Sequence, residues 1–240
     1  MTASRRATRT SLMGCAVLCA LGLTAMPPAA AAQSASTAPG VPLPSDVHPD
    51  SRSRLPPLKR ENLDQQGKEF YDALAADSRR LTGVGGPSGI RMYSPQAGDL
   101  ARRLNNYLRF ESALGARTVE LAILVTAREF DSQFEWSAHE PPALKAGVSK
   151  DLVELIRRRA PVASVSGVSE QDAAIVELGR EVFGTHRVSS ATYARALKAL
   201  GPKNLVDLTI LIGEYSATAV LLATFDQQLA AGERPPLPAR

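Results

Sequence analysis

The chain has almost no cysteine. Its two cysteines, Cys15 and Cys19, both lie near the N-terminus of the 240-residue sequence. That segment has the form of a secretory signal, so the mature chain is expected to contain no thiol. Disulfide bonds, cysteine-ligated metals and thiol chemistry are therefore excluded for the part that remains after cleavage.

The N-terminal segment 1–32 is predicted to be a signal peptide. Arg5, Arg6 and Arg9 precede an apolar run over 12–26, and four alanines over 29–32 offer a cleavage site near Ala32. The run is shorter than the ~20 residues that a spanning helix needs. We also expect no later segment to be long and apolar enough to cross a bilayer. The sequence thus predicts an exported protein, periplasmic or secreted, without stable membrane insertion.

The sequence leaves two export routes open, the general secretory route and the twin-arginine route. Ser4-Arg5-Arg6 is compatible with twin-arginine export, although the residues that follow do not strengthen it. Leu12 to Cys15 looks like a lipoprotein box, but the apolar run follows Cys15 instead of preceding it. Lipidation is therefore not predicted.

Basic tracts are also missing. The formal charge of +4 includes three signal arginines and no signal acid, so the mature chain carries about +1. No cluster of basic residues is interleaved with aromatic ones, so nucleic-acid binding has no support.

Strand signals are scarce, because aromatics make up only 5% of the chain and alternating apolar runs are not seen. The pattern predicts an all-α fold. We expect a flexible Pro/Ser/Ala-rich leader over 33–57, one helical domain over 58–231 and an irregular tail over 232–240. The leader could also be an arm that lies over a partner subunit. Helices are predicted over 63–76, 94–112, 117–128, 150–159, 170–183, 189–201 and 202–229, with a loop over 82–94.

Two breaks are expected around the middle of the chain. One lies near Asp131-Ser132, just after the very apolar helix over 117–128. The other lies after His139, because Pro142 would clash with the carbonyl of Ala138 if a regular helix continued. The helix is therefore predicted to kink or restart there.

Glu135 and His139 are the first candidates for chemistry. Their spacing of four places both on one face of a helix, where an imidazole and a carboxylate can move protons. The only tryptophan, Trp136, lies between them. Such a pair also occurs by chance on solvated helices, where it adds only ~0.2–0.5 kcal/mol.

The central motifs resemble the carboxymuconolactone decarboxylase family, which is related to the alkyl hydroperoxidase D-like proteins. The resemblance implies an oligomeric alkyl hydroperoxidase D-like helical domain: a homodimer, trimer or hexamer. It rests on Arg117-x-x-Glu120-Leu121-Ala122-Ile123-Leu124, Ala127-Arg128-Glu129, Phe134-Glu135-Trp136-x-x-His139-Glu140 and Ala143-x-x-Ala146-Gly147-Val148-Ser149.

The peroxidase branch of that superfamily uses a glutamate, a Cys-x-x-Cys pair and a histidine. Glu120 and His139 match the glutamate and the histidine, but Ser132 and Glu135 stand where the two cysteines would be. A thiol peroxidase needs a thiol. The resemblance therefore points to the branch with Glu-Trp-x-x-His.

That branch implies a cofactor-free lyase, which removes CO₂ from a small carboxylated lactone or related acid. His139 is the candidate acid/base, Glu135 would orient it, and Glu120 would be a second proton-handling carboxylate. Arg128 is a candidate for holding a substrate carboxylate, and Trp136 either lines the site or only packs. The alternatives are a non-catalytic oligomer that binds a ligand in the same pocket and, least favoured, a peroxidase-like antioxidant.

Geometry constrains this three-residue site. On one straight helix, Glu120 and Glu135 would lie about 22 Å apart. A shared site therefore needs a chain reversal near Asp131-Ser132 or a contribution from a second subunit.

Overall fold

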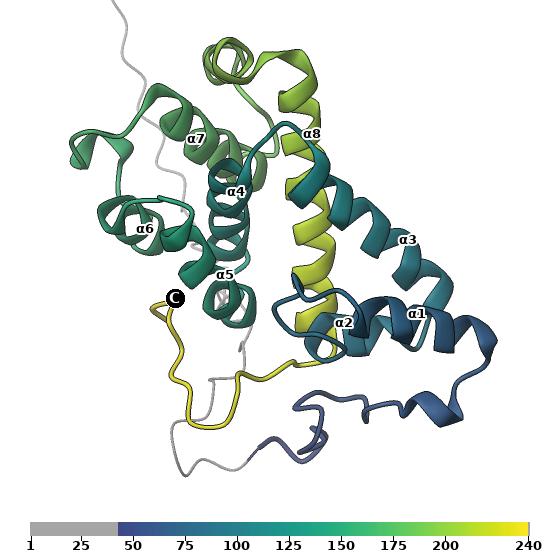
Figure 1. Cartoon of the computed structure of the whole chain (residues 1–240). Helices are drawn as coiled ribbons and strands as arrows, with labels where there is room; N and C mark the ends of the chain where they lie inside the picture. Colours follow the sequence, from purple (N-terminus) through teal and green to yellow (C-terminus); the bar gives the residue numbers. More distant parts are fainter. Residues whose placement is uncertain (1–42, 240) are drawn as a thin grey trace, which may run out of the picture. The chain divides into compact units, whose positions relative to one another are not determined.

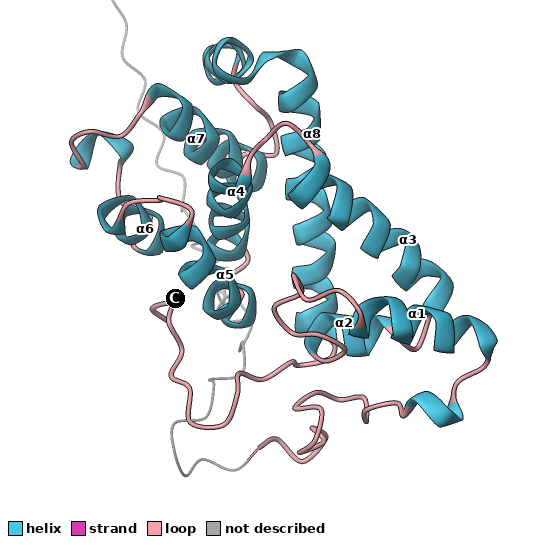
Figure 2. Ribbon diagram, in the orientation of Figure 1, coloured by secondary structure: helices cyan, strands magenta, loops and turns pink. Residues whose placement is uncertain are grey.

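The computed structural model of the chain describes residues 43–239. The predicted signal peptide and the first ten residues of the leader lie outside the described residues. All regular elements within 43–239 are helical (Figure 2), and the only strand-like pairing there is an isolated bridge between His48 and Ser53. The predicted all-α fold is confirmed.

The helices follow one another with short connections (Figure 1). In chain order they are η1 (Arg60–Asn62), α1 (Gln65–Ala75), α2 (Gly86–Arg91), α3 (Pro95–Asn106), the π-helical turn η2 (Tyr107–Glu111), α4 (Ala116–Glu129), α5 (Gln133–Lys145), α6 (Lys150–Arg157), η3 (Val162–Ser164), α7 (Glu170–Gly184) and α8 (Ser190–Thr224).

Helix α4 lies at the centre of the core. It contacts α5, α6, α7, α8 and η2, and every residue from Thr118 to Arg128 is buried. In Figure 1 it runs between α5, α7 and α8. The apolar run over 119–125 explains this position, because a helix that is apolar on nearly all faces gains most from being surrounded. Glu120, which belongs to this helix, is therefore buried in the core as well.

The chain reverses between α4 and α5, as predicted. Asp131 adopts a left-handed conformation with φ of 53°, and the backbone N–H of Ser132 donates to the carbonyl of Ala127 at 2.8 Å. Asp is among the residues that tolerate this region best. Helix α5 then returns along α4, so residues of the two helices that are far apart in sequence face one another.

Helix α5 does not restart after His139. It continues as one helix through Pro141 and Pro142 to Lys145, so of the two predicted alternatives the restart is wrong and the kink stays a prediction. The two prolines remove two backbone N–H donors from the helix. The buried Ala143 and Trp136 hold both halves of α5 against the core, and this packing outweighs the lost hydrogen bonds.

The predicted loop over 82–94 contains the short helix α2, which the sequence analysis missed. Pro87 stands in its first turn, where a missing N–H costs nothing. Six residues are too few to show a helical period, so only the burial of Ser88 and Ile90 reveals the inward face.

Helix α8 consists of two helical parts. Gly201, with φ of 73°, breaks the backbone, and Pro202 opens the second part, as predicted. By length and composition α8 is the one helix among the described residues that could cross a membrane, which corrects our expectation that none could. Half of its most apolar stretch is buried within the fold, and α8 packs on α4 and α7. Core packing therefore accounts for its apolar character.

The described part of the leader, 43–57, contacts the segment that follows α8. The backbone N–H of Arg54 donates to the carbonyl of Phe225, and that of Gln228 donates to the carbonyl of Arg52, both at 2.8 Å. Val47 and Ser53 are buried. The residues 232–239 contain no helix, and Leu237 packs on the core.

The close approach of α7 to α4 generates a stability prediction. A methyl group at Gly179 would collide with Val125 of α4. Because β-branched valine cannot move away easily, Gly179→Ala is expected to lower the free energy of unfolding by about 1–3 kcal/mol. Gly184→Ala, on the same helix with open space around it, is the matched control and is expected to be neutral or slightly stabilising. Urea denaturation of both variants measures this, and equal stabilities would contradict it.

Candidate functional site

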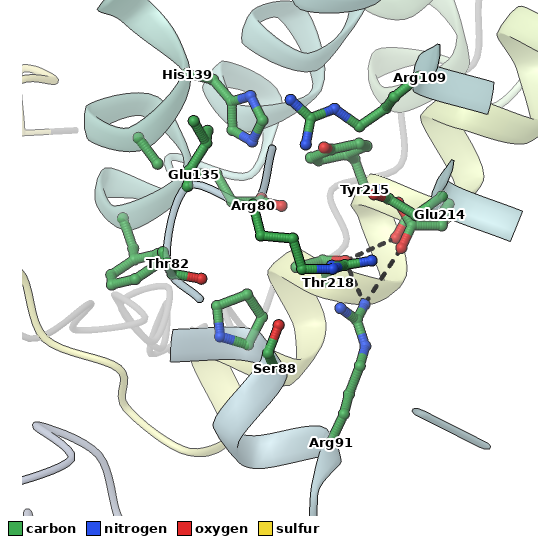
Figure 3. A pocket seen from close by; sticks show the side chains of 15 residues that line it. Arg80, Thr82, Ser88, Arg91, Arg109, Glu135, His139, Glu214, Tyr215 and Thr218 are labelled. Atoms are coloured by element: carbon green, nitrogen blue, oxygen red, sulfur yellow. Dashed lines mark hydrogen bonds and ion pairs between the residues drawn. The ribbon is translucent and has the colours of Figure 1, made fainter. Parts of the chain in front are cut away.

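A small cavity lies where α2, η2, α5 and α8 meet the loop over 80–82 (Figure 3). Its volume is about 60 Å³, which leaves room for only a few water-sized groups. We call it the inner cavity. It is lined by Arg80, Leu81, Thr82, Pro87, Ser88, Arg91, Asn105, Arg109, Phe134, Glu135, Ala138, His139, Glu214, Tyr215 and Thr218.

His139 is held by Glu120 of the neighbouring helix. The distance from His139 Nδ1 to Glu120 Oε2 is 2.7 Å, and both side chains are buried. Burial lowers the pKa of His139 below its usual value, although Glu120 acts in the opposite direction. The ring is therefore neutral near pH 7. A carboxylate only accepts hydrogen bonds, so Nδ1 carries the proton and Nε2 keeps its lone pair for proton transfer.

Arg109 keeps Glu120 ionised in the core. Its Nη2 donates to Glu120 Oε1 at 3.0 Å from the π-helical turn η2. Burial alone would raise the pKa of Glu120, but the hydrogen bond from His139 and the charge of Arg109 outweigh it and lower that pKa. Both carboxylate oxygens of Glu120 are thus engaged by cavity-lining groups.

The surroundings of Glu135 are the opposite of those of Glu120. Its side chain is buried at the cavity, and neither carboxylate oxygen makes a well-formed hydrogen bond. Burial, followed by the nearby charge of Glu214, raises the pKa of Glu135 well above its usual value; Ser132 and Arg91 oppose this without offsetting it. Glu135 therefore keeps its proton to a higher pH than an exposed glutamate does, which suits it to donate a proton.

Helix α8 closes the cavity opposite α5. Arg91 Nη2 donates to Thr218 Oγ1 at 2.6 Å and lies 3.4 Å from Glu214 Oε1 (Figure 3). Asn105 donates to the second Glu214 oxygen at 3.0 Å. The ring of Tyr215 packs edge-on against His139, with centroids 5.2 Å apart. These contacts fix the imidazole in position.

Arg80 reaches the cavity from the loop after α1. Its Nη2 donates to Asn106 at 3.0 Å, while its Nε is buried without a hydrogen-bond partner. The nearest carboxylate with which it pairs, Asp77, is 3.9 Å away and is itself held by Arg79 at 2.8 Å. Arg80 is therefore the least satisfied cation at the cavity.

The lining carries more positive than negative charge. Arg80, Arg91 and Arg109 line it together with the carboxyl groups of Glu214 and Glu135, while Glu120 lies behind the lining and is bound by Arg109 and His139. Burial favours the neutral forms of Glu135 and His139. Within 43–239, no three His, Cys, Asp or Glu side chains are grouped so that they could hold a metal ion. The cavity thus favours a small anion.

The structure brings Glu120, Glu135 and His139 together in one subunit, as the chain reversal required. The predicted partner of His139 is wrong, however. Glu120 orients the ring, and Glu135 makes no hydrogen bond to it. A glutamate one helical turn before the histidine is close in sequence, but the side chain across the α4–α5 contact has the better geometry.

Arg128 and Trp136 lie outside the inner cavity. Arg128 forms an ion pair with Asp131, and its Nε donates to the carbonyl of Arg157 at 2.6 Å. Trp136 is fully buried, donates to Glu140 at 2.7 Å and packs against the guanidinium of Arg157. Both stabilise the α4–α5–α6 contact, so neither is placed to bind a substrate there.

The sequence analysis missed the three cavity arginines and Tyr215. Arg80, Arg91 and Arg109 come from separate segments with no shared motif, so only the fold assembles them. Glu214 could have been found, since it is an acidic residue inside an apolar helix, where a buried carboxylate needs a partner.

The model of the carboxymuconolactone decarboxylase family matches residues 95–177, which include Glu120, Glu135 and His139. This central segment of the chain, from α3 into α7, is similar to the carboxymuconolactone decarboxylase family. No curated protein matches the chain. The match covers α3 to the first half of α7, and therefore contains the α4–α5 reversal but neither α2 nor α8.

A crystal structure of a protein from Agrobacterium tumefaciens shares the fold of this chain. That protein is of unknown function and has been suggested to be the antioxidant defence protein AhpD. The superposition has a TM-score of 0.51 at 18% identity, and covers 62% of this chain and 96% of the other. At this identity the likeness shows the fold alone.

The buried, unpartnered carboxyl of Glu135 generates a pH-dependent stability prediction. Below the ordinary glutamate pKa the group is neutral in both the folded and the unfolded chain. As the pH rises, only the unfolded chain ionises readily, so the folded state loses stability. Glu135→Gln is therefore expected to be more stable than the wild type at pH 8, by more than the ~0.5 kcal/mol typical of surface changes, and not at pH 4.

Thermal unfolding at both pH values measures the difference. Glu111 is exposed, so Glu111→Gln is the control. Its stability relative to the wild type is expected to be the same at both pH values. A Glu135→Gln variant that is equally affected at pH 4 and pH 8 would show that Glu135 is ionised in the folded protein.

Proposed function

We propose that this protein is a lyase that decarboxylates a small carboxylated lactone or related acid without a cofactor. The observation that carries the proposal is that buried Glu135 and His139, the latter held by Glu120 at 2.7 Å, line one cavity together with three arginines. Burial raises the pKa of Glu135 and lowers that of His139. Two titratable groups with opposite pKa shifts at one site are typical of acid–base catalysis.

Each step can be assigned to a group at the cavity. Arg80, whose Nε makes no hydrogen bond and lies 3.9 Å from Asp77, would hold a substrate carboxylate. The C–C bond to the departing carboxylate breaks, CO₂ leaves, and the electron pair stays on the substrate carbon, delocalised into the adjacent carbonyl. Glu135 donates its proton to that carbon and regains one from water. His139, held by Glu120, can accept or return a proton through Nε2.

Two other functions are outcomes of the same test. A protein that binds small acids without turning them over would be a non-catalytic binding module. The third is peroxidase-like: the structural relative has been suggested to be an antioxidant protein, but Ser132 and Glu135 offer no thiol here. Hydroperoxide consumption by the mature chain would favour this third function over ours.

The proposed chemistry predicts the effect of two substitutions on CO₂ release from carboxylated lactones. Glu135→Gln and His139→Ala are each expected to lower kcat by about 10²–10⁴, the usual contribution of a positioned acid or base. Glu111→Gln, an exposed glutamate, is the control and should keep wild-type rates. Activity retained by both cavity variants would overturn the assignment.

The same roles predict a bell-shaped dependence of the rate on pH. The rate falls on the acidic side as His139 becomes protonated, below the ordinary histidine pKa because burial lowers it. It falls on the alkaline side as Glu135 loses its proton, above the ordinary glutamate pKa. The alkaline limb should disappear from the residual activity of Glu135→Gln, and an unchanged profile in this variant would argue against Glu135 as the acid.

We also propose that the protein is a homo-oligomer. Leu100 and Leu104 of α3 and Tyr107 at the start of η2 are exposed, and their spacing places them on one face. Val206 and Ile210 are exposed on α8. The two stripes adjoin, since the Tyr107 hydroxyl contacts Lys203 at 3.1 Å. Adjoining apolar residues of this kind mark protein–protein contacts.

A charged residue in this stripe is expected to dissociate the oligomer. Ile210→Asp should lower the mass measured by analytical ultracentrifugation, while Tyr193→Asp, also exposed but in the first part of α8, should not. A monomeric wild type would contradict the proposal.

The proposal also includes export of the protein from the cytoplasm. The arginines and the apolar run of segment 1–32 support cleavage near Ala32, which would release a periplasmic or secreted chain. A substrate outside the cytoplasm would then have to be a diffusible small acid.

A further inference from the structure

A second hollow adjoins the inner cavity. It has a volume of about 710 Å³ and lies between the N-terminal strap (residues 50–61), α2 and the segment 227–230. We call it the outer chamber. Its volume falls within the ~300–1,000 Å³ of small-molecule sites, whereas the 60 Å³ inner cavity does not.

Phe134 forms the partition between the two hollows. It is the one residue that lines both of them in the described part of the chain. The edge of its ring rests against Gly86, where an added Cβ would come within 2.8 Å of Phe134 Cζ. The segment over 82–90 borders the inner cavity through Thr82 and Ser88, and the outer chamber through Val84 and Ile90.

The outer chamber is apolar inside and charged at its rim. Ile90 and Met92 are buried, and Leu55, Tyr71 and Val84 are half-buried. The charged residues Lys59, Arg60 and Glu61 are exposed, and Arg60 is already paired with Asp72. The interior thus suits a hydrocarbon chain or ring more than a second charged group.

We propose that the two hollows form one bipartite site for an amphipathic carboxylic acid. The carboxylate lies in the inner cavity near Arg80, and the apolar part lies in the outer chamber. Phe134, at the junction, is the specificity-determining residue, because its ring sets the width through which the two parts connect. The proposal rests on the proposed function only for the position of the carboxylate.

The N-terminal strap contributes to the proposed binding site. It forms one wall of the outer chamber, and it is held by its hydrogen bonds to the segment after α8, including that from Gln228 to the carbonyl of Arg52. The chamber therefore depends on residues outside the region that the family model matches. Apart from Phe134, every residue that lines the chamber lies outside the matched region, so most of the chamber wall is contributed by segments that the family model does not cover.

Calorimetric titration of the mature chain with straight-chain carboxylates, from acetate to octanoate, tests the proposal. The affinity of the wild type is expected to rise about fourfold per methylene once the chain passes Phe134, as for full burial of each group. Octan-1-ol, which lacks the carboxylate, should bind at least tenfold more weakly than octanoate. Equal affinities for all acids, or for octanol and octanoate, would overturn the proposal.

Variants separate the two parts of the site. Val84→Asp and Leu55→Asp place a charge in the chamber, so each should abolish the rise with chain length and leave acetate binding unchanged. Phe134→Trp should narrow the junction and weaken the binding of octanoate at least tenfold relative to that of acetate. Phe134→Ala should widen the junction and favour the binding of branched and aromatic acids. Phe183→Ala, remote from both hollows, is the matched control and should leave the length dependence intact.

Binding distinguishes this proposal from the lyase activity. Length-dependent binding without CO₂ release would support the bipartite site and contradict the lyase. A length dependence that persists in both chamber variants, or a Phe134→Trp variant that weakens acetate and octanoate alike, would contradict the bipartite site whatever the activity.

Discussion

The burial of one carboxylate organises the site. Glu120 belongs to α4, which the apolar core surrounds, and an ionised carboxylate there would cost several kcal/mol without partners. Arg109 and His139 supply them at 3.0 and 2.7 Å. These two contacts tie η2 and α5 to the central helix, and they place the free Nε2 of the imidazole at the cavity. The requirement to compensate a buried charge therefore positions the groups that are proposed to carry the chemistry.

Two glutamates near one cavity have pKa values shifted in opposite directions because their surroundings differ. Glu120 is ionised since both of its oxygens accept hydrogen bonds from cationic or imidazole donors. Glu135, on the helix that faces it, is buried without a well-formed hydrogen bond, so its pKa is raised and it keeps its proton to a higher pH. The same side chain thus supplies an orienting anion in one place and a proton donor in the other. Family members with cysteine at the position of Glu135 would place a thiol beside the same histidine, so one scaffold can support different chemistries.

Much of the helical pattern could be predicted from local sequence. Ser149, Ser169 and Ser189 cap their helices through side-chain hydrogen bonds, and Gly201-Pro202 separates the two parts of α8, as expected. Local signals failed where tertiary contacts decide. Helix α2 is too short to show a period, and α5 continues through two prolines because Trp136 and Ala143 are anchored in the core. The apolar stripe on α3 was correctly read as a helix, but it faces outward.

The sequence by itself determined the helical fold, the absence of a thiol after cleavage of the predicted signal, and the Glu135–His139 pair, because composition, capping and motif spacing are local properties. Glu120 joined this pair only through the resemblance to the family. Only the tertiary structure decided the role that each residue can take. It selected Glu120 over Glu135 as the partner of His139, directed Arg128 to Asp131, and brought Arg80, Arg91 and Arg109 from three distant segments to one cavity. The physical reason is that charge compensation and burial depend on neighbours in space, which the order of residues along the chain does not specify.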